Sequence, residues 1–112
     1  MPGRRSPAGP VRPAGPAGAP AAKYFAAVSA AGALLRGNAT SGGSEASTGT
    51  YVVGFGERVT GCAYTATLGS TDGNAPPAGR VTVRELDGRV GVQTFDLAGN
   101  AADLPFHLVV AC

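Results

Sequence analysis

Very few residues in this chain have the chemistry that catalysis needs. His107 is the single histidine. By strand alternation it points away from the face that carries Phe106, Leu108 and Val110. A catalytic triad would need that imidazole beside a nucleophile and an acid, but the serines cluster in residues 41–48, outside any nucleophile-elbow pattern. We therefore expect a surface or interface histidine, no catalytic residue and a protein that is not an enzyme.

The acidic residues do not follow a metal-binding pattern. Four aspartates lie in or beside expected turns, where this residue type hydrogen-bonds the nearby backbone: Asp72, Asp87, Asp96 and Asp103. A calcium loop would need alternating acidic residues, and that spacing is missing. The Gly-Phe-Gly of residues 54–56 is not followed by the Lys-Ser or Lys-Thr of a phosphate loop. The sequence predicts no metal site and no cofactor.

Cys62 and Cys112 are the two cysteines, and their wide spacing excludes C-x-x-C chemistry. Each lies on the apolar face of an expected strand, so the sulfurs can pair if the two strands are neighbours; the alternative is two buried free thiols. A bridge would close a loop of about 50 residues and remove roughly 4 kcal/mol of chain entropy from the unfolded state. It would also indicate an oxidising compartment or an extracellular particle.

Charge is distributed unevenly along the chain, whose net charge is +2. Four of the nine basic residues come early (Arg4, Arg5, Arg12 and Lys23), and all seven acidic residues come later. A basic segment can contact phosphates, but these four charges are widely spaced and no aromatic residue lies between them to stack on bases. We expect a solvated spacer and no nucleic-acid partner.

The first 21 residues follow a period of three. Glycines occupy the first place of several triplets and prolines the second: Gly3, Gly9, Gly15 and Gly18, with Pro7, Pro10, Pro13 and Pro16. Ser6 and Arg12 stand where a collagen frame requires glycine. The segment predicts a collagen-like or polyproline arm, disordered or extended. No apolar run in the chain is long enough to span a membrane, so we expect no membrane insertion.

Residues 22–112 alternate in twos and predict one β-sandwich head domain. Expected strands cover residues 23–30, 34–40, 50–56, 62–68 and 106–112, and a hairpin covers 80–95 around the turn dipeptide Asp87-Gly88. Residues 41–49, 69–79 and 97–103 are expected loops. The last strand is the most apolar and should be central. The fold class is all-β, an antiparallel sandwich or jelly-roll-like head.

Three segments carry a resemblance: "YFAAVSAAGALLRG", "GTYVVGFGERVTGCAYTATLG" and "VQTFDLAGNAADLPFHLVVAC". They resemble a small β head domain that follows collagen-like repeats in bacterial surface proteins, and similar segments occur in phage tail-fibre tips. That head is similar in shape to the trimeric jelly rolls of complement and tumour-necrosis-factor proteins. The resemblance implies that Tyr51, Val53 and Phe55 are core residues, that Cys62 and Cys112 form a disulfide, and that residues 106–110 form the closing strand.

Two functions remain open from the sequence. The first expectation is a non-enzymatic structural or adhesive head domain, a homotrimer displayed on a cell surface or virus particle, with a surface receptor or a structural scaffold protein as partner. The alternative is a monomeric, secreted β-sandwich binding module whose arm is a flexible linker. Both readings place the protein outside the cell or on a virion.

Overall fold

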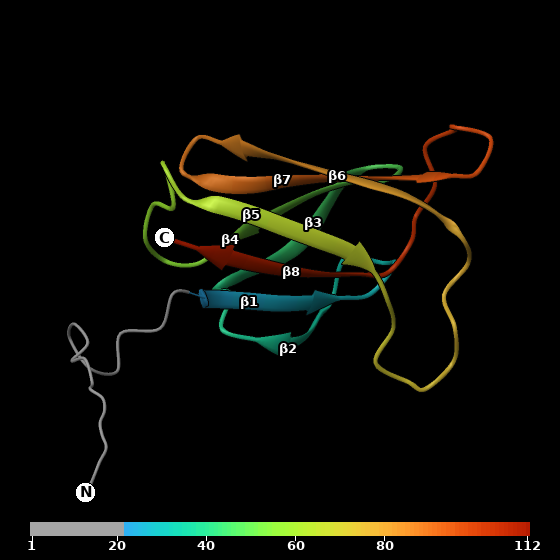
Figure 1. Ribbon diagram of the computed structural model, residues 1–112, viewed down its shortest axis with the longest axis horizontal. Coiled ribbons are helices and arrows are strands. Elements are labelled where there is room, and N and C mark those ends of the chain that lie inside the picture. The colour runs from blue at the N-terminus through green and yellow to red at the C-terminus, as the bar shows by residue number, and fades with distance from the viewer. Residues whose placement is uncertain (1–21) are drawn as a thin grey trace, which may run out of the picture.

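The computed structural model describes the backbone of residues 22–112 and the side chains of that range other than residues 22, 23 and 41–46. The predicted arm, residues 1–21, lies outside the described residues. Eight strands make up the head (Figure 1): β1 (Ala22–Val28), β2 (Leu34–Gly37), β3 (Ser41–Ser47), β4 (Thr50–Gly54), β5 (Ala63–Leu68), β6 (Gly79–Leu86), β7 (Arg89–Asp96) and β8 (Phe106–Ala111).

The strands form two four-stranded antiparallel sheets that pack as a sandwich. The first sheet has the order β2-β1-β8-β5 and the second the order β3-β4-β7-β6. The prediction of an all-β antiparallel sandwich is therefore confirmed. Strand β8 lies between β1 and β5, as its apolar sequence predicted. From residue 22 onward, the chain contains no helix with the length and apolarity of a membrane span.

Register within the first sheet brings core residues together in rows. Val28 lies opposite Phe106 and Phe106 opposite Leu68, and the next inward row pairs Ala26 with Leu108. Because facing residues in an antiparallel pair point to the same side, these rows meet the inward side chains of the second sheet. The core that results also contains Tyr51, Val53, Val59, Val90, Val92 and Val110, all with no exposed surface.

One expected loop is a strand. Residues 41–49 were predicted to be a loop from their glycines and serines, but residues 41–47 form β3, which pairs with β4. The pairing is irregular and lies at the edge of the sheet, where backbone hydrogen bonds to a single neighbour are enough to hold a strand of poor β-propensity. The turn falls at Gly49, whose φ of 69° is accessible to glycine.

The hairpin prediction is confirmed in detail. Strands β6 and β7 pair from Gly79 opposite Asp96 to Leu86 opposite Arg89. That register leaves Asp87 and Gly88 as the two turn residues, with φ values of 50° and 79°. Positive φ at both positions is the geometry that the Asp-Gly dipeptide favours in tight hairpins.

The head has two distinct ends. At the arm end lie Ala22, where β1 begins, together with Cys62, Cys112 and the β6-β7 turn (Figure 1). At the opposite end, called here the distal end, lie the connections of residues 29–33, 69–78 and 97–105. Because residue 21 is joined to Ala22, the arm leaves the head at the end that also holds the C-terminus.

Candidate functional site

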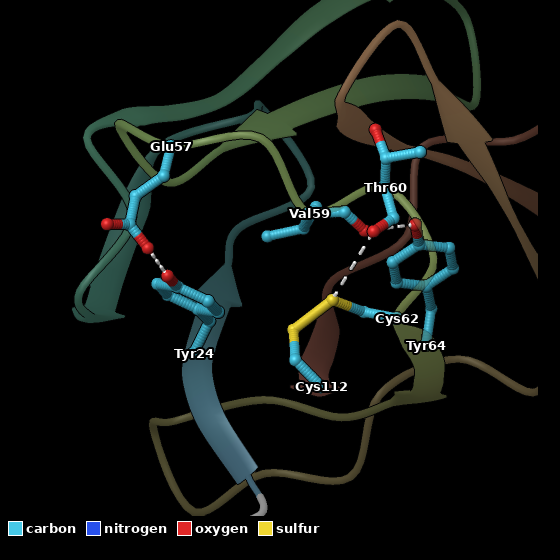
Figure 2. Close-up of a disulfide and its surroundings, with 7 residues drawn as sticks. All are labelled: Tyr24, Glu57, Val59, Thr60, Cys62, Tyr64 and Cys112. Carbon is cyan, nitrogen blue, oxygen red and sulfur yellow. Dashed lines mark hydrogen bonds between the residues drawn. A yellow bond between two sulfur atoms is a disulfide. The ribbon is translucent and has the colours of Figure 1, made fainter.

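A disulfide joins two strands of the first sheet at the arm end. The sulfurs of Cys62 and Cys112 lie 2.07 Å apart, next to the point where β5 pairs with β8 (Figure 2). The neighbouring hydroxyl of Tyr64 donates a hydrogen bond of 2.6 Å to the Val59 carbonyl oxygen, which fixes the turn that precedes Cys62. Partial burial, with a smaller contribution from the Glu85 carboxylate, raises the pKa of Tyr64. The bridge expected from the sequence is present, and the reading of two free thiols is wrong.

The four aspartates named from the sequence lie apart, and two of them, Asp72 and Asp96, accept hydrogen bonds from nearby backbone amides. Asp72 Oδ1 accepts from the Asn74 amide at 3.0 Å, and Asp96 Oδ1 accepts from the Asn100 amide at 3.0 Å. Asp103 Oδ1 accepts from the Gly49 amide at 2.7 Å. Exposed Asp87 lies 3.6 Å from the Arg58 guanidinium. Among the side chains that the structure describes, which leave out residues 22, 23 and 41–46, no three of His, Cys, Asp or Glu gather in a way that could hold a metal ion.

His107 projects from β8 on the outward side of the first sheet, as predicted from alternation. Its neighbours across the sheet are Ala27 on one side and Thr67 on the other. Its Nε2 is buried and has no hydrogen-bond partner among the described residues. Gly69 lies directly against the ring, since a Cβ built there would be 3.3 Å from Nε2. Buried polar atoms usually have a hydrogen-bond partner. The Nε2 atom of His107 is an exception among the described side chains.

The outward face of the β2-β1-β8-β5 sheet is apolar at its centre. Phe25 and Val109 lie opposite each other on β1 and β8, with 51% and 40% of their surfaces exposed. Leu35 on β2 is 50% exposed. We call Phe25, Leu35 and Val109 the apolar face. The outward residues around it are small, hydroxyl-bearing or basic, and none of them is acidic: Ala27, Arg36, Ala63, Thr65, Thr67, His107 and Ala111.

The outward face of the other sheet has the opposite character. Arg80 lies across from Phe95, with its guanidinium carbon 6.0 Å from the ring centre, and so covers that aromatic residue. Thr82 lies opposite Gln93, and Arg84 lies opposite Gly91. These polar and cationic side chains are exposed. Only one of the two sheets therefore presents bare large hydrophobic residues to solvent, and the two faces are suited to different surroundings.

A pocket of about 250 Å³ opens at the distal edge of the apolar face. Apolar lining comes from Ala27, Val28, Leu35 and Pro105, and polar lining from Ser29, Ser70, Thr71, Asp72 and His107. Across its rim, the Arg36 guanidinium donates a hydrogen bond of 3.4 Å to the Thr71 carbonyl oxygen. This contact ties β2 to the loop that follows β5.

Asp72 remains ionised at this rim at neutral pH. The Asn74 backbone amide, and next the Ser70 hydroxyl, lower its pKa below the ordinary value of an aspartate. Hydrogen bonds to a carboxylate favour its charged form. The rim consequently carries the negative charge of Asp72 as well as the positive charge of the Arg36 guanidinium.

Sequence reasoning found part of this surface. Alternation placed His107 on the outward side of its strand, which the register confirms, but it did not decide which side of β1 faces solvent. It did not identify Leu35 as exposed or the loop of residues 69–72 as the pocket wall, because both depend on how the chain folds back over the sheet. No family model, curated protein or solved structure matches the chain.

Proposed function

We propose that this chain is a non-enzymatic structural or adhesive head domain that assembles as a homotrimer and is displayed on a cell surface or virus particle. The observation that carries the proposal is the apolar face of Phe25, Leu35 and Val109 on an otherwise well-packed sandwich. Contiguous exposed apolar surface marks interaction sites more often than scattered single residues do.

Copies of this chain are the occupant that the sequence favours for that face. The arm has a Gly-X-Y frame, and such frames work in three-chain assemblies. The arm is joined to β1 at Ala22, and Phe25 lies three residues further along that strand. Three heads that pack around one axis through this face would therefore bring their β1 strands, and the points where the arms are attached, near that axis. The described outward side chains of this face include no carboxylate, and the one guanidinium among them, that of Arg36, is engaged by the Thr71 carbonyl oxygen.

The disulfide supports display outside the reducing cytosol. Bridges such as Cys62–Cys112 persist in oxidising surroundings and are rare where thiols are kept reduced. A head of about 90 residues buries a modest core, so a covalent link between the strands at its arm end has a large effect on stability. Cell surface and virion are both oxidising locations, and the proposal covers both.

Light scattering of the unreduced full chain tests the assembly. We expect a mass three times the 11.0 kDa of one chain at micromolar concentration. Phe25→Glu and Val109→Glu should each lower the mass to that of a monomer while the circular dichroism of the β-sheets is retained, because both side chains are exposed in the single subunit. Thr82→Glu, on the outward face of the other sheet, is the matched control and should leave the trimer intact.

A monomeric mass for the unmodified chain would contradict the trimer and favour the alternative, a monomeric secreted binding module. If Thr82→Glu dissociates the trimer and Phe25→Glu does not, the interface lies on the β3-β4-β7-β6 sheet, and the role proposed for the apolar face is wrong.

A further inference from the structure

The pocket at the distal edge of the apolar face has no assigned role in the proposed trimer, and its place in the head points to another function. Its walls come from the end of β1, from Leu35 on β2, and from the loop that follows β5. Phe25 and Val109 pair closer to the arm end than Ala27 and His107 do. The pocket thus lies at the end of the head that is farthest from the attachment of the arm, which is the end a displayed head presents outward.

The lining has two sides with different chemistry. Leu35, Pro105 and Ala27 form an apolar wall. The remaining lining includes residues that carry hydroxyl groups and one that carries a carboxylate. Ser29 Oγ accepts a hydrogen bond of 3.0 Å from the Ala33 amide and can still donate its own proton. Asp72, ionised as described above, is a strong acceptor. A ligand that fits must combine an apolar face with an edge that both donates and accepts hydrogen bonds.

The volume of the pocket and the charges around it restrict the class of ligand further. A volume of about 250 Å³ is below the roughly 300–1,000 Å³ of pockets for drug-sized molecules, so it suits a single ring. The Asp72 carboxylate in the lining opposes an anion, and the Arg36 guanidinium at the rim already donates a hydrogen bond to the Thr71 carbonyl oxygen. Phosphate, sulfate and acidic sugars are disfavoured on these grounds. A neutral ring with hydroxyls along one edge and C–H groups on its face remains.

We propose that this pocket binds one neutral sugar residue of a glycan. The C–H face of the sugar lies on the wall of Leu35 and Pro105, and its hydroxyls exchange hydrogen bonds with Ser29, Thr71 and Asp72. Binding of this kind uses a few placed polar groups within an apolar cleft, as ligand pockets usually do. The site would give the displayed head its target. It shares Leu35 with the apolar face, and its other walls come from residues outside that face.

The single histidine provides a direct readout. His107 lines the pocket, and its imidazole C–H proton resonance in the untagged full chain cannot be confused with that of another histidine. The probes are the methyl glycosides of glucose, galactose, mannose and N-acetylglucosamine, each titrated to about 100 mM so that binding in the millimolar range reaches saturation. We expect at least one of them to shift this resonance saturably. Glucuronic acid, which carries a carboxylate on the same ring, should bind more weakly than glucose.

Asp72→Asn removes the charge and keeps an acceptor for the Asn74 amide, so the turn should survive. We expect it to weaken binding about tenfold, as loss of hydrogen bonds to a charged group does. Asp87→Asn, in an exposed turn at the arm end, is the matched control and should leave the affinity unchanged. The proposal is overturned if no glycoside shifts the His107 resonance, or if Asp72→Asn binds as well as the unmodified chain. Either result would leave the mass of the assembly, and so the trimer proposal, unaffected.

Discussion

At the scale of single residues, neighbours in sequence have opposite environments. Tyr24 is 8% exposed and packs against Phe55 with ring centres 5.0 Å apart, and its hydroxyl donates a hydrogen bond to Glu57. Phe25, the next residue, points to solvent from the same strand. A strand that is buried on one side imposes this alternation. The residue scale therefore separates side chains that hold the sandwich together from those available for contacts outside it.

The disulfide gives a prediction at this scale. Cys62→Ser should lower the free energy of unfolding by about 4 kcal/mol, because the bridge closes a loop with a sequence separation of 50 and so restricts the unfolded chain. Chemical denaturation monitored by circular dichroism would measure the loss.

Cys112→Ser should have the same effect, and the double variant should cost no more than either single one, because both changes remove one interaction. Two titratable thiols in the unreduced native protein, or a double variant with twice the loss, would contradict the bridge.

At the scale of elements, one glycine holds the β3-β4 turn against β7 and the distal loop. The Gly49 carbonyl oxygen accepts from the Thr94 amide at 2.8 Å, and the Gly49 amide donates to Asp103. Thr94 itself has no exposed surface and donates from its hydroxyl to the Ala102 carbonyl oxygen at 2.5 Å. These bonds explain how an edge strand rich in glycine and serine keeps its place, since its turn is fastened to two other elements.

Replacement of Gly49 tests how much these hydrogen bonds stabilise the turn. A Cβ at Gly49 would lie 2.6 Å from the Thr94 carbonyl oxygen, so Gly49→Ala combines an unfavourable positive φ with a backbone clash. Gly73→Ala is the matched control, because Gly73 also has a positive φ but nothing lies within 4 Å of its Cβ position.

We expect Gly73→Ala to cost about 1 kcal/mol from backbone strain alone, and Gly49→Ala to cost roughly 2 kcal/mol more from the clash. Urea unfolding of the two variants measures the difference. Equal losses would show that the turn can shift away from Thr94 and that its bonds contribute little.

At the scale of the whole molecule, the head has an apolar outward face, a polar outward face, an arm end and a distal end. Strand β1 begins and β8 ends at the arm end (Figure 1), where the disulfide also lies. The pocket lined by Ser29, Thr71 and Pro105 lies at the distal end. This division agrees with a domain that is held at one end, associates through one sheet and makes contacts at its distal end.

Removal of residues 1–21 tests how the assembly is divided between arm and head. All eight strands and both cysteines lie within residues 22–112, so we expect the truncated chain to keep its β-sheet circular dichroism. Its trimer should dissociate at a higher protein concentration than that of the full chain, because the arm adds effective concentration and the apolar face supplies the contacts.

Sedimentation over a range of concentrations would show the change. A truncated chain that stays monomeric at every concentration would assign the assembly to the arm, and identical dissociation of both chains would make the arm a plain linker.

The sequence alone determined the fold class, the hairpin around Asp87-Gly88 and the central place of β8, because alternation and turn chemistry are local properties that survive in any packing. It also indicated that His107 faces outward. It could not place β3, since residues 41–47 have no apolar pattern of their own and pair only because β4 offers them an edge.

Only the tertiary structure decided which apolar residues remain bare and where polar groups converge. Phe25, Leu35 and Val109 share one face because β1 lies between β2 and β8, an order that no single segment encodes. The pocket exists because the loop after β5 folds back beside Ser29 and His107, residues distant from it in sequence. Such convergence arises from pairing between strands that are far apart in the chain. The sequence pattern of one strand does not say which other strands will lie beside it.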